Sequence, residues 1–158
     1  IIRANHPNRT VIIGPAFWNG IDYLHKLVLP EDDRNLIVTV HYYHPMPFTH
    51  QGAPWSLENK DVSGIQYLAS PEEIQSMRKD FDNVQAWASA NNRPIYLGEF
   101  GAYEKADLTS RVRYTETVAR EAEKQGWSWG YWQFDSDFIV YDIDRDAWVE
   151  PILRALIP

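Results

Sequence analysis

The stretch from Ile95 to Phe100 most constrains the fold, because it is an apolar run that carries a single charged residue, Glu99. Continuous apolar runs of this length are typical of strands buried on both faces, as in parallel sheets. Gly98 and Gly101 flank the carboxylate and leave room for a ligand or a neighbouring backbone. The carboxyl end of such a strand is where α/β folds carry their chemistry. From this run alone, a catalytic carboxylate and a structural Glu that caps the next turn remain equal alternatives.

Three more short runs, rich in β-branched or aromatic residues, predict strands at residues 10–15, 36–40 and 127–133. Helical patterns and loops separate the four predicted strands. Strands that alternate with helices form parallel βαβ units, so we predict one α/β domain over residues 1–158. Four strands with their helices make half of an eight-stranded barrel, or a small open sheet.

Local signals mark the first long helix clearly. Ser70 is a predicted N-cap, Pro71 fits the first helical position, and Glu73 completes a capping box. Apolar residues then recur at helical spacing and give one buried stripe. The pair Asn91–Asn92 is expected to end this helix before the Ile95–Phe100 strand.

The remaining segments are predicted from similar signals. A second helix is expected over residues 107–125 with Gly126 as its C-cap, and a short one near residues 149–156. Residues 46–70, rich in Gly, Pro and aromatic residues, are predicted to form a long loop of the kind that is often functional. Residues 1–5 resemble the last turn of a helix.

Composition excludes several classes of partner. The formal net charge of −7 argues against a nucleic-acid or anionic-membrane surface, whose electrostatic footprint is basic. No run approaches the roughly 20 apolar residues of a membrane span. The chain has no cysteine, which excludes disulfides and thiolate sites. Seven Trp residues suit a surface that stacks on sugar rings, although aromatic residues also fill ordinary cores.

Polar or aromatic residues follow each predicted strand. Parallel strands bring their carboxyl ends to one face, so these residues are expected to converge there. A carboxylate beside a Tyr hydroxyl and a Trp face suits cleavage of a glycosidic bond. Tyr43 is placed to donate a hydrogen bond to Glu99, which favours the charged form that a nucleophile needs. In chain order the set is Trp18, Asn19, His41, Tyr43, Glu99, Trp132 and Gln133.

These motifs together resemble glycoside hydrolase family 5, the cellulase family of (β/α)8 barrels. The Glu99 strand resembles the nucleophile motif of that family, and His41-Tyr42-Tyr43 resembles its His-x-Tyr motif. Residues 127–134 resemble the eighth strand with its sugar-stacking Trp, and residues 10–15 resemble the fifth strand. The resemblance covers essentially the whole chain, in order, as strands five to eight.

The resemblance implies a fold and roles for individual residues. The chain would be a parallel (β/α) half-barrel, the C-terminal half of the catalytic domain of a retaining endo-β-1,4-glucanase. Glu99 would be the nucleophile, and Tyr43 would orient its carboxylate. His41 would assist near the acid/base, and Trp132 would form the floor of the −1 subsite.

The loops supply weaker candidates for substrate binding, namely Trp18, Asn19 and Trp55. The substrate implied by the resemblance is a β-glucan polysaccharide or oligosaccharide, with β-mannan or xylan as alternatives. No cofactor is implied, and secretion is expected from the family.

One part of the family pattern is missing from the sequence. The general acid/base of the family is a Glu in an Asn-Glu-Pro motif, and that motif does not occur here; Glu58-Asn59 has the reverse order, in a loop. Retaining hydrolysis needs two carboxyl groups about 5 Å apart, and losing general acid help costs about 10²–10⁴-fold. Half a barrel also has two unpaired sheet edges. We therefore predict a homodimer, or complementation by an N-terminal half-barrel.

Two classes of function stay open at this stage. One is a glycoside hydrolase or its catalytic half; the other is an inactive, self-associating half-barrel that at most binds sugars. Metal binding is not predicted, because the spacing of His41, His44 and His50 matches no metal motif. The acidic residues 135–146 lack the Gly and closing Glu of an EF-hand, so we expect a solvated loop there.

Overall fold

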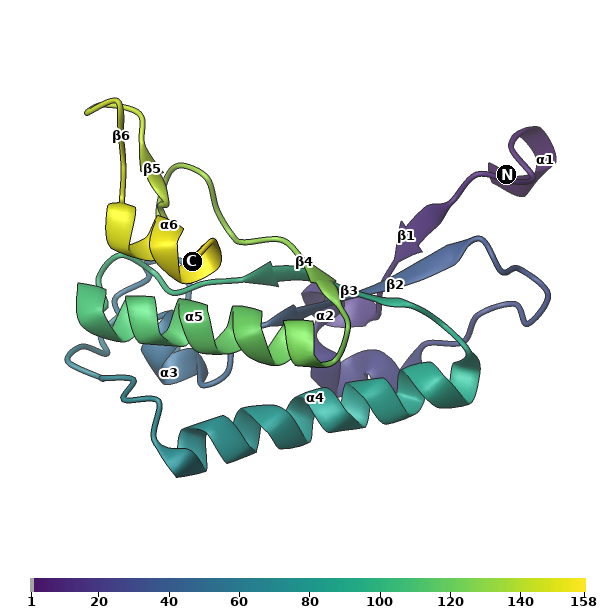
Figure 1. Ribbon diagram of the computed structural model, residues 1–158, viewed down its shortest axis with the longest axis horizontal. Helices are drawn as coiled ribbons and strands as arrows, with labels where there is room; N and C mark the ends of the chain where they lie inside the picture. Colours follow the sequence, from purple (N-terminus) through teal and green to yellow (C-terminus); the bar gives the residue numbers. More distant parts are fainter. Residues whose placement is uncertain (1) are drawn as a thin grey trace.

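The computed structural model describes residues 2–158 and is built on a four-stranded parallel sheet with the order β1–β2–β3–β4 (Figure 1). The strands are Val11–Ile13 (β1), Leu36–Tyr42 (β2), Ile95–Phe100 (β3) and Ser128–Trp129 (β4). Each neighbouring pair is parallel. The predicted α/β fold with a parallel sheet is therefore confirmed.

The lengths of three strands differ from the prediction. β2 runs two residues further than expected, whereas β1 and β4 are shorter. β1 and β4 have a neighbour on one side only, so fewer backbone bonds keep them regular. The chain after β4 still follows β3, because Gly130 N–H donates to Leu97 O at 2.8 Å and Trp132 N–H donates to Phe100 O at 2.9 Å.

The first long helix, α4 (Pro71–Asn91), begins and ends as its local sequence predicts. The Ser70 hydroxyl accepts from the Glu73 N–H at 3.2 Å, and the Glu73 carboxylate accepts from the Ser70 N–H at 2.7 Å. This is the capping box. At the other end Asn92 adopts the left-handed conformation, which stops the helix.

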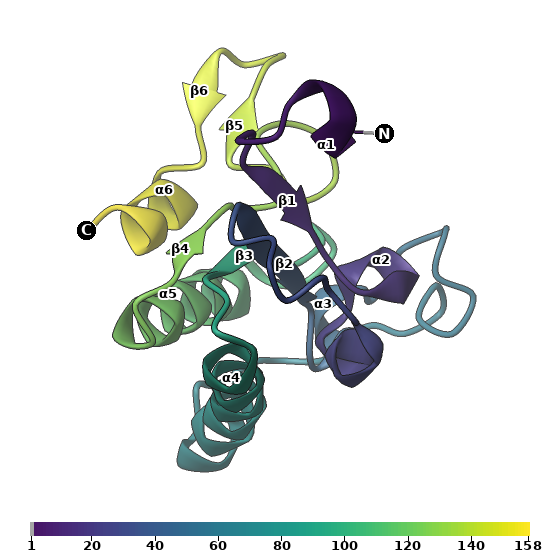
Figure 2. The same ribbon diagram turned by 90° about the vertical axis from the view of Figure 1, so that its right-hand side faces the viewer.

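Helix α5 (Leu108–Lys124) lies beside α4 on the same side of the sheet, and α6 (Glu150–Leu156) packs against α5 (Figures 1 and 2). The Asp107 side chain caps α5 by accepting from Ser110 N–H at 2.9 Å. The C-cap of α5 is Gln125, one residue earlier than predicted. Gly126 follows with φ of 76°, a left-handed conformation that Gly adopts at little cost.

The main core lies between the sheet and these helices. Alternate residues of β2, Val38, Val40 and Tyr42, are buried on the helix side. The Tyr42 ring packs edge-on against Phe81 of α4, with ring centroids 5.0 Å apart. Because side chains alternate along a strand, the residues between them, including His41, belong to the opposite face.

Several short elements were not predicted. The expected loop at residues 46–70 begins with a one-turn helix, and the segment after β1 contains two helical turns. The solvated loop expected at residues 135–146 is wrong in part, because its second half belongs to an antiparallel hairpin. Residues 1–5 do include a helical turn, although Ile1 lies outside the described residues. These elements are α1 (Ile2–Asn5), α2 (Ala16–Asn19), η1 (Ile21–Lys26), α3 (Met46–Thr49), β5 (Tyr141–Asp142) and β6 (Ala147–Trp148).

Aromatic packing explains the hairpin. The rings of Phe134 and Tyr141 are stacked with centroids 5.0 Å apart, and Trp148 meets the Tyr141 ring edge-on at 4.9 Å. The Asp142 carboxylate accepts from Arg145 N–H at 3.0 Å within the turn. Cross-strand aromatic pairs and an Asp in the turn are common in hairpins, but here they stand among acidic residues that mask the pattern.

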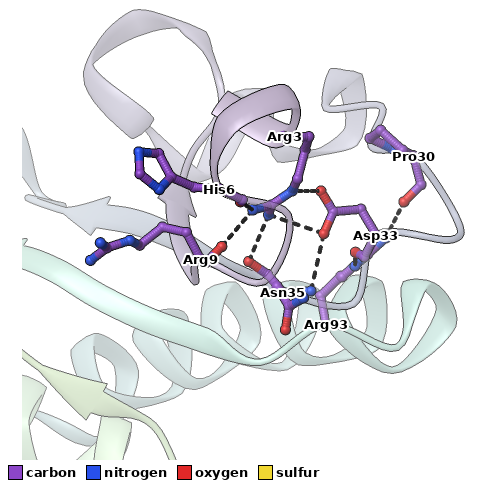
Figure 3. Close-up of polar contacts among 7 residues, drawn as sticks. All are labelled: Arg3, His6, Arg9, Pro30, Asp33, Asn35 and Arg93. Carbon is purple, nitrogen blue, oxygen red and sulfur yellow. Dashed lines mark hydrogen bonds and ion pairs between the residues drawn. The ribbon is translucent and has the colours of Figure 1, made fainter. Parts of the chain in front are cut away.

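A polar network ties the chain together at the amino ends of the strands (Figure 3). The Arg3 guanidinium binds both carboxylate oxygens of Asp33, at 2.6 and 3.0 Å, and also donates to Asn35 O at 3.1 Å. Arg93, which is buried, donates to the backbone carbonyls of Asp33 and Pro30. The network joins α1, the loop before β2 and the start of β3, and it lies at the end of the strands opposite to Glu99.

Within residues 2–158, every helix is too short or too polar to traverse a lipid bilayer.

Candidate active site

The structure brings Glu99, Tyr43 and His41 together at the carboxyl ends of β2 and β3. The Tyr43 hydroxyl donates to Glu99 Oε2 at 3.0 Å. His41 Nδ1 lies 3.1 Å from the same oxygen, an ion-pair distance, although the contact does not have the geometry of a hydrogen bond. Both contacts use Oε2, and Oε1 has no hydrogen-bond donor among residues 2–158. One carboxylate oxygen is thus held while the other stays open to a ligand.

An irregularity in the sheet places His41 opposite Glu99. Val40 pairs with Leu97, and His41 pairs with Glu99, so Gly98 is passed over in the register. The glycine leaves room for the Thr39 side chain, because a Cβ at Gly98 would lie 2.3 Å from the Thr39 hydroxyl oxygen. Bulges of this kind re-aim side chains next to active sites.

Asn19 reaches the same group from the turn after β1. Its Nδ2 lies 3.2 Å from His41 Nε2. The amide nitrogen can only donate, so Nε2 is the acceptor in this contact and Nδ1 is the ring nitrogen that carries a proton, facing Glu99. Phe17, Trp18 and Asn19 all have left-handed backbone conformations, with φ of 56°, 54° and 58°. This turn is what carries Asn19 to His41.

The electrostatics of the site keep the Tyr43 proton in place. Burial, followed by the negative charge of Glu99, raises the pKa of the Tyr43 phenol far above its ordinary value of 10.0. Tyr43 therefore acts as a hydrogen-bond donor at any working pH. It fixes the direction of the Glu99 carboxylate without competing for its charge.

The backbone of Trp132 contacts the two residues that follow Glu99. Its N–H donates to Phe100 O, and a Cβ on Gly101 would lie 2.2 Å from Trp132 O. The close approach of a neighbouring backbone, predicted for the glycines around Glu99, therefore occurs at Gly101. The Trp132 side chain is 41% exposed, so it offers surface for stacking.

The other two predicted tryptophans lie outside the strands and are exposed. Trp18 neighbours Asn19 in the left-handed turn and is 86% exposed. Trp55, 51% exposed, packs edge-on against Tyr103 with centroids 4.9 Å apart. The structure does not bring either indole into direct contact with Glu99.

Residues that were not predicted connect Tyr43 with Trp55. Phe138 packs against Tyr43 at 5.8 Å, against Tyr103 at 6.0 Å and against Trp55 at 6.4 Å between centroids. His50 meets the Tyr43 ring edge-on at 5.0 Å, and burial lowers its pKa, so its imidazole is neutral near pH 7. These rings form a continuous aromatic wall beside the site. Only the high aromatic content of the 46–70 loop hinted at it.

The three His residues considered for a metal are dispersed. His41 faces Glu99, His44 lies between Asp22 and Asp80, and His50 contacts the Thr49 hydroxyl. Within the described part of the chain, no three His, Asp or Glu side chains are grouped in a way that would hold a metal ion.

Known proteins are similar to this chain in both sequence and fold. The sequence profile of cellulase (glycosyl hydrolase family 5) matches residues 1–138. Endoglucanase H of Acetivibrio thermocellus is 35% identical over 99% of this chain. A Thermotoga maritima Cel5A structure in complex with cellobiose superposes with a TM-score of 0.95 at 47% identity. The cellulose synthase subunit Z of Clostridioides difficile superposes with a TM-score of 0.94 at 40% identity. Both superpositions cover 99% of this chain.

The chain spans about half the length of the solved relatives, namely 50% of Cel5A and 52% of subunit Z. It spans 17% of the length of endoglucanase H. The solved relatives are (β/α)8 barrels, which confirms the predicted half-barrel fold; its numbering as strands five to eight stays a prediction. Because the family profile covers most of the sequence, the chain belongs to glycosyl hydrolase family 5, the cellulase family.

Proposed function

We propose that this chain carries the nucleophile side of a retaining endo-β-1,4-glucanase, with Glu99 as the nucleophile. The observation that supports this role is the asymmetric carboxylate, with Oε2 held by Tyr43 at 3.0 Å and Oε1 open. Oε1 would attack the anomeric carbon and form a covalent glycosyl-enzyme, which water then hydrolyses. Tyr43 orients the carboxylate, and His41 assists near the acid/base.

The sugar would be bound by stacking. Trp132 supplies an exposed indole, its backbone contacts the residues that follow Glu99, and it is the proposed floor of the −1 subsite. Trp18 and Trp55 are the proposed platforms further along the glucan, and Asn19 is proposed to contact substrate as well as His41. Because a polymeric glucan cannot enter a cell, an extracellular location is part of the proposal.

A second four-stranded unit is proposed to close the barrel, and only a unit other than a copy of this chain would add an Asn-Glu-Pro motif. The sequence has no Asn-Glu-Pro motif, and β1 and β4 each have one free edge. We propose that these edges pair with a second four-stranded unit, either another copy of this chain or an N-terminal half-barrel. Light scattering coupled to size exclusion tests the first option. A monomer would exclude the homodimer, and a co-expressed N-terminal half should then bind.

The missing acid/base also supports a second candidate function. A half-barrel that self-associates and binds glucan through its tryptophans would need no second carboxylate. The two candidates differ in whether Glu99 reacts, so the test must not depend on general acid help.

A 2-deoxy-2-fluoro-β-cellobioside with a dinitrophenolate leaving group meets this requirement, because such a leaving group departs without protonation. Mass spectrometry of the intact protein and of its peptides should find the sugar on Glu99. Glu99→Gln should not be labelled, and Glu104→Gln, a charge-matched change outside the site, should label like the wild type. Sugar binding without any label on Glu99 would favour the non-catalytic candidate.

A further inference from the structure

The end of β2 is held from the side opposite to Glu99. Asp80, on α4, has one carboxylate oxygen, Oδ2, that contacts two residues of the β2 end. The Tyr42 hydroxyl donates to it at 3.3 Å, and His44 Nδ1 lies 3.3 Å from it. His44 Nε2 is also 3.4 Å from the carboxylate of Asp22 on η1. Two helical elements thus hold one imidazole.

These contacts interleave with those of the active site. His41 and Tyr43 reach Glu99 on one side, whereas Tyr42 and His44 reach Asp80 on the other. Tyr43 therefore lies between two residues that share one anchor. The backbone of Tyr43 has little freedom to rotate once Tyr42 and His44 are fixed, because peptide units are planar.

The backbone carbonyls of the same segment are fixed too. The buried Tyr114 hydroxyl of α5 donates to Tyr42 O at 3.2 Å. The Thr49 hydroxyl of α3 donates to Tyr43 O at 2.6 Å. Asp80 is the only one of these anchors that holds side chains on both sides of Tyr43.

We propose that Asp80 is a positioning residue for the active site, which acts through Tyr42 and His44 to hold Tyr43 within hydrogen-bond reach of Glu99. The effect of Asp80 on the position of Tyr43 does not depend on the function of the protein. Its effect on the reactivity of Glu99 rests on the proposed role of Glu99 as the nucleophile. Misplacing an orienting group by about 1 Å can cost about 10²-fold in rate, so a contact behind the strand can matter for chemistry.

The charge of His44 strengthens this anchor. The hydrogen bond to Asp80, with a further contribution from Asp22, raises the pKa of His44 above its ordinary 6.5, although burial opposes the shift. An imidazolium donates from both nitrogens, and a neutral imidazole donates from one. The groups that face His44 are these two carboxylates and the Tyr42 phenol, and Glu72 and Glu73 line the adjoining pocket. The anchor is therefore complete below the raised pKa and loses a donor as pH rises through it.

Asp80→Asn tests the proposal, with Asp82→Asn as the matched control. Asp82 is on the same helix but accepts from the Gln125 side chain at 2.8 Å, away from β2. In protein labelled with ¹³C at Tyr Cζ, the Tyr43 resonance reports its hydrogen bond to Glu99, and Glu99→Ala, which removes the acceptor, gives the value for a broken bond. Asp80→Asn should move this resonance towards that value, whereas Asp82→Asn should leave it at the wild-type position. An unmoved Tyr43 resonance in Asp80→Asn overturns the proposal.

The rate of Glu99 labelling by the fluorocellobioside gives the second readout. We expect Asp80→Asn to slow labelling about 10- to 100-fold and Asp80→Glu to restore part of it. Equal urea midpoints for the Asn variants exclude a general loss of stability. Labelling at the wild-type rate in Asp80→Asn would contradict the proposal. If the wild type is not labelled while the Tyr43 resonance responds as expected, the positioning stands and the proposed function fails.

Discussion

Glu121 on α5 provides a quantitative test of how the helix layer is held together. Its buried carboxylate accepts from Arg78 of α4 at 2.8 and 2.9 Å and from Lys124 at 2.7 Å. The hydrogen bond to Arg78 contributes most to lowering the pKa of Glu121 from its ordinary 4.5 to about 2. We predict that Glu121→Gln destabilises the protein at pH 7 and that the deficit vanishes in acid.

The magnitude follows from the pKa. A shift from 4.5 to about 2, at about 1.36 kcal/mol per pKa unit, corresponds to at most about 3.4 kcal/mol. Arg78 is 53% exposed and Lys124 is 61% exposed, so water screens both partners. We therefore expect a loss of about 1–2 kcal/mol in the free energy of unfolding.

The sign is fixed by linkage. A carboxyl group whose pKa is lower in the folded state stabilises fully above its unfolded pKa, and this contribution fades as pH falls from about 4.5 towards 2. Urea unfolding followed by Trp fluorescence at pH 7 and at pH 2.5 measures the difference between variant and wild type. All other carboxylates are shared, so their effects cancel.

Glu116→Gln is the control, because Glu116 is exposed on the same helix. It should change the free energy of unfolding by less than about 0.5 kcal/mol. The reasoning is refuted if Glu121→Gln behaves like this control at pH 7. It is also refuted if the deficit of Glu121→Gln is the same at both pH values.

Three further changes test the site and its scaffold. Tyr43→Phe removes one hydrogen bond to the charged Glu99, so labelling of Glu99 should slow about 10- to 100-fold, and an unchanged labelling rate would refute the orienting role. Gly98→Ala places a Cβ 2.3 Å from the Thr39 hydroxyl and should lower the free energy of unfolding in urea by about 1–3 kcal/mol, whereas a neutral result would show that the Thr39 side chain moves aside without cost. Asp33→Asn removes the carboxylate whose pKa is lowered, mainly by the bond to Arg3, so thermal unfolding at neutral pH should come earlier than in the wild type, with the gap closing as pH falls.

Local sequence determined much of the helix layer. Ser70, Pro71 and Glu73 specify the start of α4, and the capping contacts between Ser70 and Glu73 lie within one helical turn. The β2 and β3 strands are continuous apolar runs, which only a sheet covered by other elements can bury. Such signals depend on neighbours in the sequence, so they are readable without the fold.

The edges of the fold were less readable. β4 is shorter than its apolar run, and the hairpin of β5 and β6 lies in a stretch that looked like a solvated loop. In both places the outcome depends on distant partners, the β3 backbone in one case and the Phe134 and Tyr141 stack in the other. Propensity in a short window does not contain that information.

The sequence by itself determined which chemical groups stand at the strand ends and to which family they belong. Only the tertiary structure decided how they meet. The strand register passes over Gly98 and so sets His41 opposite Glu99. Three consecutive residues with left-handed backbone conformations carry Asn19 to His41. A left-handed conformation costs about 1–2 kcal/mol for each residue that is not glycine. Local preferences oppose such a turn. The Asn19–His41 contact at 3.2 Å opposes this cost, and it joins residues 22 positions apart, which no short-range pattern encodes.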